Sequence, residues 1–208
     1  MPELDKAGRQ EFLRHFPVSH ETLAKFDRYA ELLTEWNARF NLVAESTLPH
    51  IWRRHFLDSA QLIKFVPAGA RTLADLGSGA GFPGLVLSIM GMPEVHLIES
   101  TGKKANFLRT VIEELKPGAV VHQARIESIH NLKFDVITAR ALKPLRQLLK
   151  LAKPLMKKDS LCLLLKGKTL DAELTESAEY RKFDYETFPS LSDSFGRVLV
   201  IGNRKSEK

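Results

Sequence analysis

The chain has 208 residues, of which 44% are hydrophobic, and this is enough for one large α/β domain with a short extension. Residues 1–5 include the acids Glu3 and Asp5, and no run of 18 apolar residues follows, so we expect neither a signal peptide nor a membrane span. The single cysteine, Cys162, cannot form an internal disulfide, and we expect a cytoplasmic protein. A net charge of +6 permits a polyanionic partner such as nucleic acid without requiring one.

The first third of the chain has the residue spacing of helices. Apolar side chains recur every three or four positions over residues 23–37, and Ser19 is a suitable N-cap for that helix. A further helix is expected over residues 47–65, because Pro67 follows it as a terminator. We therefore predict an N-terminal helical extension over residues 1–66.

The pattern then changes to short apolar strands that alternate with helices. The expected strands lie at residues 72–76, 95–98, 120–121, 134–138 and 161–165. The expected helices between them lie at residues 83–90, 103–115 and 144–152. Residues 183–188 and 197–202 predict a terminal hairpin. This order is typical of βαβ units, so we predict an α/β domain over residues 67–204 and a short tail over 205–208.

A glycine-rich turn occupies residues 75–84, between the first expected strand and the helix after it. Two patterns overlap there: the G-x-G-x-G of S-adenosylmethionine sites at Gly77, Gly79 and Gly81, and the G-x-G-x-x-G of dinucleotide sites at Gly79, Gly81 and Gly84. Glu99 follows the next strand, where a carboxylate can accept hydrogen bonds from both ribose hydroxyls of an adenosine. The motif predicts a nucleoside-type cofactor and leaves its identity open.

Two features favour the methyl donor over the dinucleotide. Roughly 70 mostly helical residues precede the first strand, whereas a dinucleotide-binding domain usually begins with it. Too little chain follows for a separate hydride-acceptor domain. An NAD-binding oxidoreductase is the second hypothesis, and a non-catalytic RNA-binding protein on a methyltransferase scaffold, suggested by the basic charge, is the third.

Several motifs along the chain resemble those of the RsmG (GidB) family. They are Asn41-Leu42, Arg54-His55-Phe56-Leu57-Asp58-Ser59, the turn from Gly77 to Gly84, Glu99-Ser100-Thr101-Gly102-Lys103-Lys104, Arg125-Ile126-Glu127, Ala139-Arg140-Ala141 and Leu165-Lys166-Gly167. The resemblance covers essentially the whole chain, and its Arg-His-x-x-Asp-Ser element is more specific than the glycine turn. Val43 departs from the family pattern, which usually has a threonine there.

The resemblance implies a Rossmann-like S-adenosylmethionine-dependent methyltransferase fold, with a mostly parallel seven-stranded sheet and helices on both faces. It also implies N7-methylation of a guanine in the 530 loop of 16S ribosomal RNA, within the small ribosomal subunit or an assembly intermediate. The matched positions imply cofactor contacts at Gly77, Phe82, Ile126, Glu127 and Arg140. The motif analysis adds Gly79 and Glu99. We expect a monomer.

Guanine N7 has a lone pair and no proton, so its methylation by in-line displacement needs alignment rather than a general base. Arg140 follows an expected strand, at the edge where parallel sheets bind ligands, and we expect it to position the reactants with Asp58 and His55. By itself, His55 is better explained as a hydrogen-bond partner of Asp58. Candidates for RNA binding are Arg54, Lys103, Lys104, Lys166 and Arg197. No His, Cys or acidic cluster has metal-site spacing, so no metal is expected.

Overall fold

The computed structural model describes residues 5–176 and 184–202. Its helices are α1 (Lys6–His15), α2 (His20–Phe40), α3 (Asp58–Ala60), α4 (Gly84–Ile89), α5 (Gly102–Leu115), α6 (Leu145–Ala152) and α7 (Leu170–Thr175). Its strands are β1 (Thr72–Leu76), β2 (Glu94–Ile98), β3 (Ala119–His122), β4 (Phe134–Arg140), β5 (Met156–Lys166), β6 (Asp184–Pro189) and β7 (Arg197–Gly202). In these ranges no helix is both long and apolar enough to cross a membrane.

Every expected strand is present, although several bounds differ. Strand β1 has the expected bounds, whereas β5 begins at Met156, five residues before position 161. The terminal hairpin is confirmed as β6 and β7, apart from Phe183, which lies outside the described residues. The expected tail over residues 205–208 lies outside them too.

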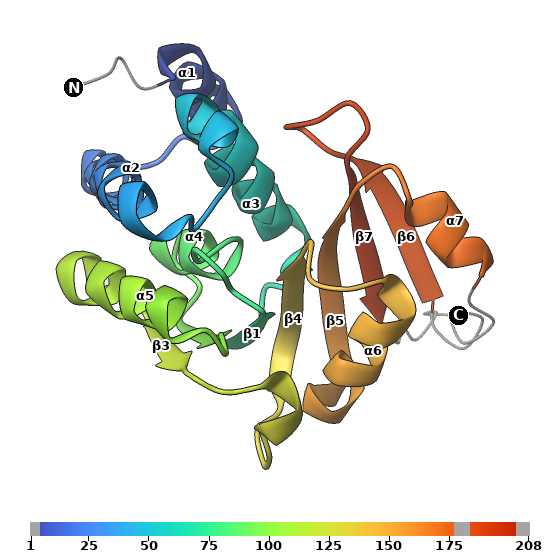
Figure 1. The fold of residues 1–208 in the computed structure, drawn as a ribbon. Coiled ribbons are helices and arrows are strands. Elements are labelled where there is room, and N and C mark those ends of the chain that lie inside the picture. Colours follow the sequence, from blue (N-terminus) through green and yellow to red (C-terminus); the bar gives the residue numbers. More distant parts are fainter. Residues whose placement is uncertain (1–4, 177–183, 203–208) are drawn as a thin grey trace.

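The strands form one sheet of seven in the order β3-β2-β1-β4-β5-β7-β6 (Figure 1). Strands β1 to β5 pair in parallel, and β7 is antiparallel to both β5 and β6. The mostly parallel seven-stranded sheet is therefore confirmed. Dinucleotide-binding folds have the strand order 3-2-1-4-5-6, without a strand inserted beside the fifth. The position of β7 thus argues against the oxidoreductase hypothesis.

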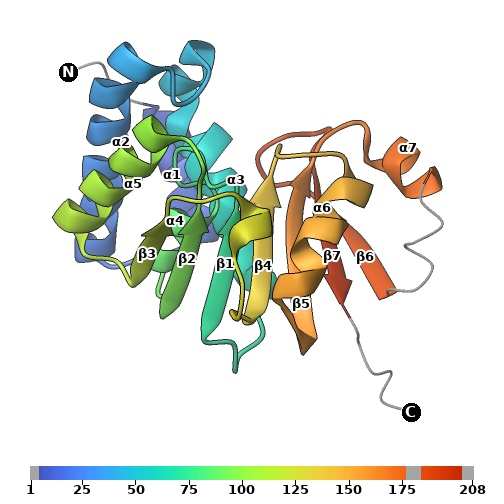
Figure 2. The same cartoon turned by 60° about the horizontal axis from the view of Figure 1, so that its bottom comes forward.

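Helices cover both faces of the sheet, as expected (Figure 2). Side chains alternate between the faces along each strand. On β5, Leu163 joins the core that contains Phe26 of α2 and Phe107 of α5. Its neighbour Leu164 joins a second core with Leu148 of α6. The N-terminal helices therefore pack on the same face as α4 and α5, and α6 packs on the other.

The helix expected over residues 47–65 is divided into shorter pieces. They are a 3₁₀ helix at Glu45–His50, a π turn at Trp52–Leu57, α3, and a 3₁₀ helix at Gln61–Phe65. The carboxylate of Asp5 accepts from the N–H groups of Trp52 at 3.1 Å and Arg53 at 3.3 Å, which stabilises the start of the π turn. The wider turn buries Trp52, His55 and Phe56 together. The expected helical segment is therefore present, but it changes between 3₁₀, π and α geometry along its length.

Candidate active site

The loop between β1 and α4 turns sharply at Gly77. Its φ of +66° is left-handed, a conformation that favours glycine. The N–H groups of Gly77 and Ser78 donate to the carbonyl of Ile98 in β2, at 2.9 and 3.1 Å. These bonds attach the turn to the carboxyl end of β2. The turn lines a cavity of about 600 Å³, which we call the cofactor cavity.

Asp75 is a fully buried acid beneath this turn. One carboxylate oxygen accepts from the hydroxyl of Thr138 in β4 at 2.8 Å, and the other accepts from the N–H of Gly84 at 3.2 Å. Burial raises the pKa of Asp75 to about 6, although these hydrogen bonds lower it. The carboxyl group connects β1 to β4 and to the first residue of α4, and so supports the shape of the turn.

Glu99 stands at the end of β2 and is 7% exposed. Its Oε2 accepts from the N–H of Gly79 at 2.9 Å, and its Oε1 accepts from the N–H of Thr101 at 2.7 Å. Each carboxylate oxygen has a second lone pair, so the group can still accept hydrogen bonds from two ribose hydroxyls. Gly79 and Glu99, which the motif analysis paired, therefore lie in direct contact in the cofactor cavity.

The cofactor cavity fits an adenosine-type group in size and chemistry. Its volume lies in the usual range for small-molecule sites, and it offers a carboxylate, glycine backbone and apolar walls such as Leu142. Val43 also borders it, so the position where the family usually has a threonine presents an apolar side chain there. The structure brings together all seven residues expected at the cofactor: Gly77, Gly79, Phe82, Glu99, Ile126, Glu127 and Arg140.

A second cavity, of about 660 Å³, lies beside the first. We call it the substrate cavity. The ends of β4 and β5 and the β6–β7 loop, residues 190–196, form much of its wall. Six residues line both cavities: Thr47, His55, Arg140, Ala141, Leu142 and Lys143. Two ligands bound in the two cavities would therefore meet at Arg140 and His55. In the ranges that the structure describes, no group of three or more His, Cys, Asp or Glu residues is arranged to hold a metal ion.

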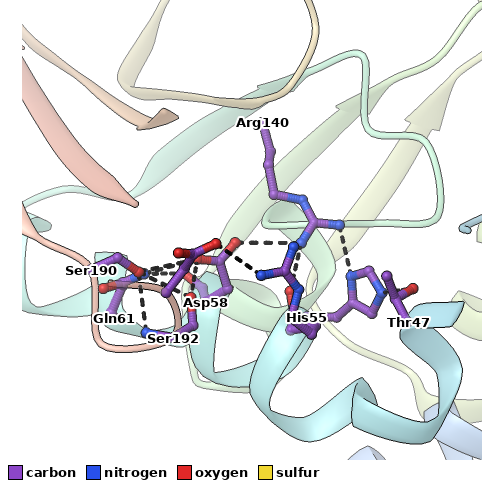
Figure 3. A network of polar contacts seen from close by, with 9 residues as sticks. Thr47, His55, Asp58, Gln61, Arg140, Ser190 and Ser192 are labelled. Carbon is purple, nitrogen blue, oxygen red and sulfur yellow. Dashed lines mark hydrogen bonds and ion pairs between the residues drawn. The ribbon is translucent and has the colours of Figure 1, made fainter. Parts of the chain in front are cut away.

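A chain of hydrogen bonds fixes the tautomer of His55 at this junction (Figure 3). Thr47 Oγ1 donates its only hydrogen to the carbonyl of Ala44 at 2.6 Å, so it accepts from His55 Nε2, which is 2.8 Å away. The bare Nδ1 of His55 then accepts from Nη2 of Arg140 at 2.9 Å. Burial, followed by the charges of Arg140 and Arg54, lowers the pKa of His55 to about 3. His55 is therefore a neutral imidazole that orients the guanidinium.

Asp58 holds the other side of this guanidinium. Its Oδ2 pairs with Nη1 of Arg140 at 3.4 Å, and its Oδ1 accepts from Ser192 Oγ at 2.6 Å and Gln61 Nε2 at 3.1 Å. Arg140 lies between Asp58 and His55 (Figure 3). Both ring nitrogens of His55 are bound to Arg140 and Thr47. The expected direct pair of His55 with Asp58 is therefore wrong, and each contacts Arg140 instead.

The ring of Phe82 packs against both His55 and the guanidinium of Arg140. Its ring stacks on His55 with centroids 4.7 Å apart and on Tyr29 with centroids 5.5 Å apart. The Cζ atom of Arg140 lies 4.9 Å from the centre of the same ring. The hydroxyl of Tyr29 donates to the carbonyl of Ala80, within the glycine turn. Through α2, the N-terminal helices therefore support both the turn and the junction.

The five basic residues expected at the RNA have different surroundings. Arg54, Lys166 and Arg197 line the substrate cavity, Lys104 lines the cofactor cavity, and Lys103 lies over the ring of Phe40.

Lys166 is not available as a surface cation, contrary to expectation. Its Nζ pairs with Glu173 of α7 at 2.6 Å, and its side chain is only 10% exposed. Arg54 also pairs, with Asp193 at 2.9 Å, but its side chain is 48% exposed.

Four residues of the polar network had no signal in the sequence: Thr47, Gln61, Ser190 and Ser192. Ser192 contacts Asp58 from 134 residues along the chain, and no local pattern connects two such positions. Gln61 accepts from the N–H of Leu191 at 2.8 Å, which attaches the β6–β7 loop to the N-terminal helical segment. Only the folded sheet brings these groups together.

Residues 22–194 match the family model GidB, described as rRNA small subunit methyltransferase G. The chain is 48% identical to ribosomal RNA small subunit methyltransferase G of Paramagnetospirillum magneticum over 194 residues, which are 93% of this chain and 95% of that protein.

Solved structures show the same fold at low identity. A putative O-methyltransferase from Klebsiella pneumoniae has a TM-score of 0.62 at 14% identity, with 97% of this chain and 98% of that chain covered. The complex of M. jannaschii TYW2 with AdoMet has a TM-score of 0.53 at 15% identity, with 70% and 74% covered. The fold is that of S-adenosylmethionine-dependent methyltransferases.

Proposed function

The chain belongs to the rRNA small subunit methyltransferase G family, and on that premise we propose that it methylates N7 of a guanine in the 530 loop of 16S ribosomal RNA. S-adenosylmethionine is the cofactor and supplies a sulfonium methyl group that a nitrogen lone pair can take directly. The relatives are named for action on ribosomal RNA of the small subunit, and the basic charge of this chain suits such a substrate.

The meeting of the two cavities at Arg140 and His55 is the observation that carries the proposal. One cavity fits the cofactor, and the other is large enough for a single nucleotide turned out of its RNA. Transfer by in-line displacement requires the donor and the acceptor side by side. The Arg140 guanidinium, held from both sides, can orient a guanine by donating to its O6 acceptor, which lies beside N7 and leaves the N7 lone pair free.

The polar groups at the junction already bond to one another, which favours a methyl-accepting atom that carries no proton. Nδ1 of His55 accepts from Arg140, Oδ1 of Asp58 accepts from Ser192, and Oδ2 of Asp58 forms the ion pair with Arg140. A substrate atom that must lose a proton would compete with these bonds for a base. Guanine N7 carries a lone pair and no proton, so we propose displacement without a general base. Arg140, Asp58 and His55 then act by positioning.

On the cofactor side, we assign the ribose hydroxyls to Glu99 and the close approach of backbone to Gly77 and Gly79. Ile126, Glu127 and Phe82 complete the wall.

On the RNA side, we assign phosphate contacts to Arg54, Lys104 and Arg197, which are at least partly exposed and line the two cavities. We further propose that a monomer acts on the small ribosomal subunit or an assembly intermediate, and hence in the cytoplasm.

The test incubates the protein with methyl-labelled S-adenosylmethionine and small ribosomal subunits that lack this modification. The RNA is then cleaved chemically at 7-methylguanosine and the position is mapped. We expect one labelled site, in the 530 loop, and strong loss of label with Arg140→Met. A label at another position or atom would overturn the assignment. No label, with cofactor binding demonstrated separately, would favour the RNA-binding hypothesis instead.

A further inference from the structure

The β6–β7 loop presents Phe195 at the edge of the substrate cavity. Phe195 is 60% exposed, more than any other large hydrophobic side chain of the described residues. Its chain neighbours Asp193, Gly196 and Arg197 line the cavity. A single exposed phenylalanine is common on protein surfaces, so its surroundings must decide whether it has a role.

The loop that carries Phe195 is firmly attached. The N–H of Phe195 donates to Asp193 Oδ1 at 2.9 Å, and the other oxygen of Asp193 pairs with Arg54 at 2.9 Å. Further along the loop, Ser192 binds Asp58 at 2.6 Å. The backbone position of Phe195 is therefore set by contacts to the N-terminal helical segment, while its ring remains exposed.

The surroundings of the ring are cationic. Nζ of Lys168, from the β5–α7 loop, lies 3.9 Å from the ring centre. The acids of the substrate cavity are neutralised in three ion pairs: Asp58 with Arg140, Glu173 with Lys166, and Asp193 with Arg54. Three other cations here, Lys143, Lys168 and Arg197, form no ion pair with a carboxylate of the described residues, although the charge of Lys168 also acts on nearby Asp193. The edge of the cavity thus combines an exposed aromatic ring with net positive charge.

We propose that Phe195 is a stacking platform for an unpaired nucleobase beside the target guanine, with Lys168 and Arg197 at the adjoining phosphates. The inference rests on the proposed function, because it assumes that the substrate cavity receives the guanine. A base inside a duplex has both faces covered by its neighbours, so the partner is an unpaired base of a loop. Every base has a π face, so stacking on Phe195 adds affinity with little dependence on sequence.

Binding of model RNAs tests this without any methyl transfer. The probes are a labelled single strand of about 12 nucleotides and a duplex of the same length. We expect Phe195→Ala to bind the single strand about tenfold more weakly and the duplex as the wild type does. Phe195→Trp should restore binding, whereas Phe195→Leu, which keeps apolar bulk without a π system, should not.

Tyr185→Ala is the matched control, since Tyr185 is a 47% exposed aromatic residue of the same hairpin. It pairs with Ile201, toward the end of the hairpin opposite the cavity, and its loss should leave RNA binding unchanged. Single-strand binding by Phe195→Ala or Phe195→Leu at the wild-type level would overturn the stacking role.

Methylation of small ribosomal subunits separates this inference from the proposed function. We expect Phe195→Ala to raise KM for the subunit about tenfold, with kcat and cofactor affinity unchanged. If the wild type does not methylate the subunit but single-strand binding still depends on Phe195, the proposed function is wrong and the stacking role of Phe195 is supported. If methylation occurs and Phe195→Ala has the wild-type KM and single-strand affinity, the stacking role is wrong and the proposed function is supported.

Discussion

Replacement of Asp75 by asparagine tests the account of the buried acid beneath the glycine turn. Burial raises the pKa of Asp75 from its ordinary value of 3.8 to about 6. Between these pH values the folded protein holds a proton that the unfolded chain has released. The free energy of unfolding therefore falls as the pH rises through this range. At roughly 1.4 kcal/mol per pH unit, the loss amounts to about 3 kcal/mol.

The asparagine variant has no charge to titrate at this position. Its amide oxygen can accept from the Gly84 N–H, and its amide nitrogen can donate to the Thr138 hydroxyl after that hydroxyl rotates. The packing is thus preserved while the pH-dependent contribution disappears. Relative to Asp75→Asn, the wild type should be about 2 kcal/mol less stable at pH 8 than it is at pH 4, because the unfolded aspartate is already partly ionised at pH 4.

Urea unfolding followed by tryptophan fluorescence measures this difference, because Trp52 is buried. Taking wild type minus variant at each pH removes the contribution of groups that titrate equally in both. Thr138→Val removes a hydrogen bond that lowers the pKa of Asp75, so it should extend the decline to higher pH. A difference that stays constant from pH 4 to 8, or that grows in favour of the wild type, would refute the reasoning.

Three further predictions concern the site. Glu99→Ala removes the carboxylate that accepts from two backbone N–H groups and that we assign to the ribose hydroxyls. Calorimetry should therefore show at least about tenfold weaker binding of S-adenosylhomocysteine. Unchanged affinity would contradict the assignment. Because the pKa of His55 is about 3, the rate of methyl transfer should show no step near pH 6.5. Thr47→Val removes the acceptor that fixes the His55 tautomer and should lower kcat, whereas Thr47→Ser should retain it. Equal rates for the two variants would show that Thr47 does not act through that tautomer. Lys166→Met leaves Glu173 without its ion-pair partner and should destabilise the fold by ~2 kcal/mol in denaturant titrations, with most of this recovered by adding Glu173→Gln.

The alternation of strands and helices and the glycine-rich turn could be predicted from short-range patterns, whereas the seven-stranded methyltransferase architecture was implied by the family resemblance. The strands appear as short, nearly continuous apolar runs, because both faces of the sheet are covered, and the helices appear as apolar repeats of about 3.6 residues. The turn and Glu99 belong to one β-turn-α-β unit, so their spacing along the chain already implies their contact.

The arrangement around Arg140 depended on the tertiary structure. Asp58 and Ser192 lie 134 residues apart and meet only because β7 inserts beside β5 and brings the β6–β7 loop to the N-terminal helical segment. The π turn that contains His55 begins with two N–H groups that donate to Asp5, which lies about 47 residues earlier in the chain. Lys166 appears in the sequence as a surface cation and becomes a partner of Glu173 once α7 packs beside its strand. Hydrogen bonds and ion pairs act over a few ångströms of space, so their partners are decided by which surfaces the sheet brings together, and spacing along the chain cannot reveal them.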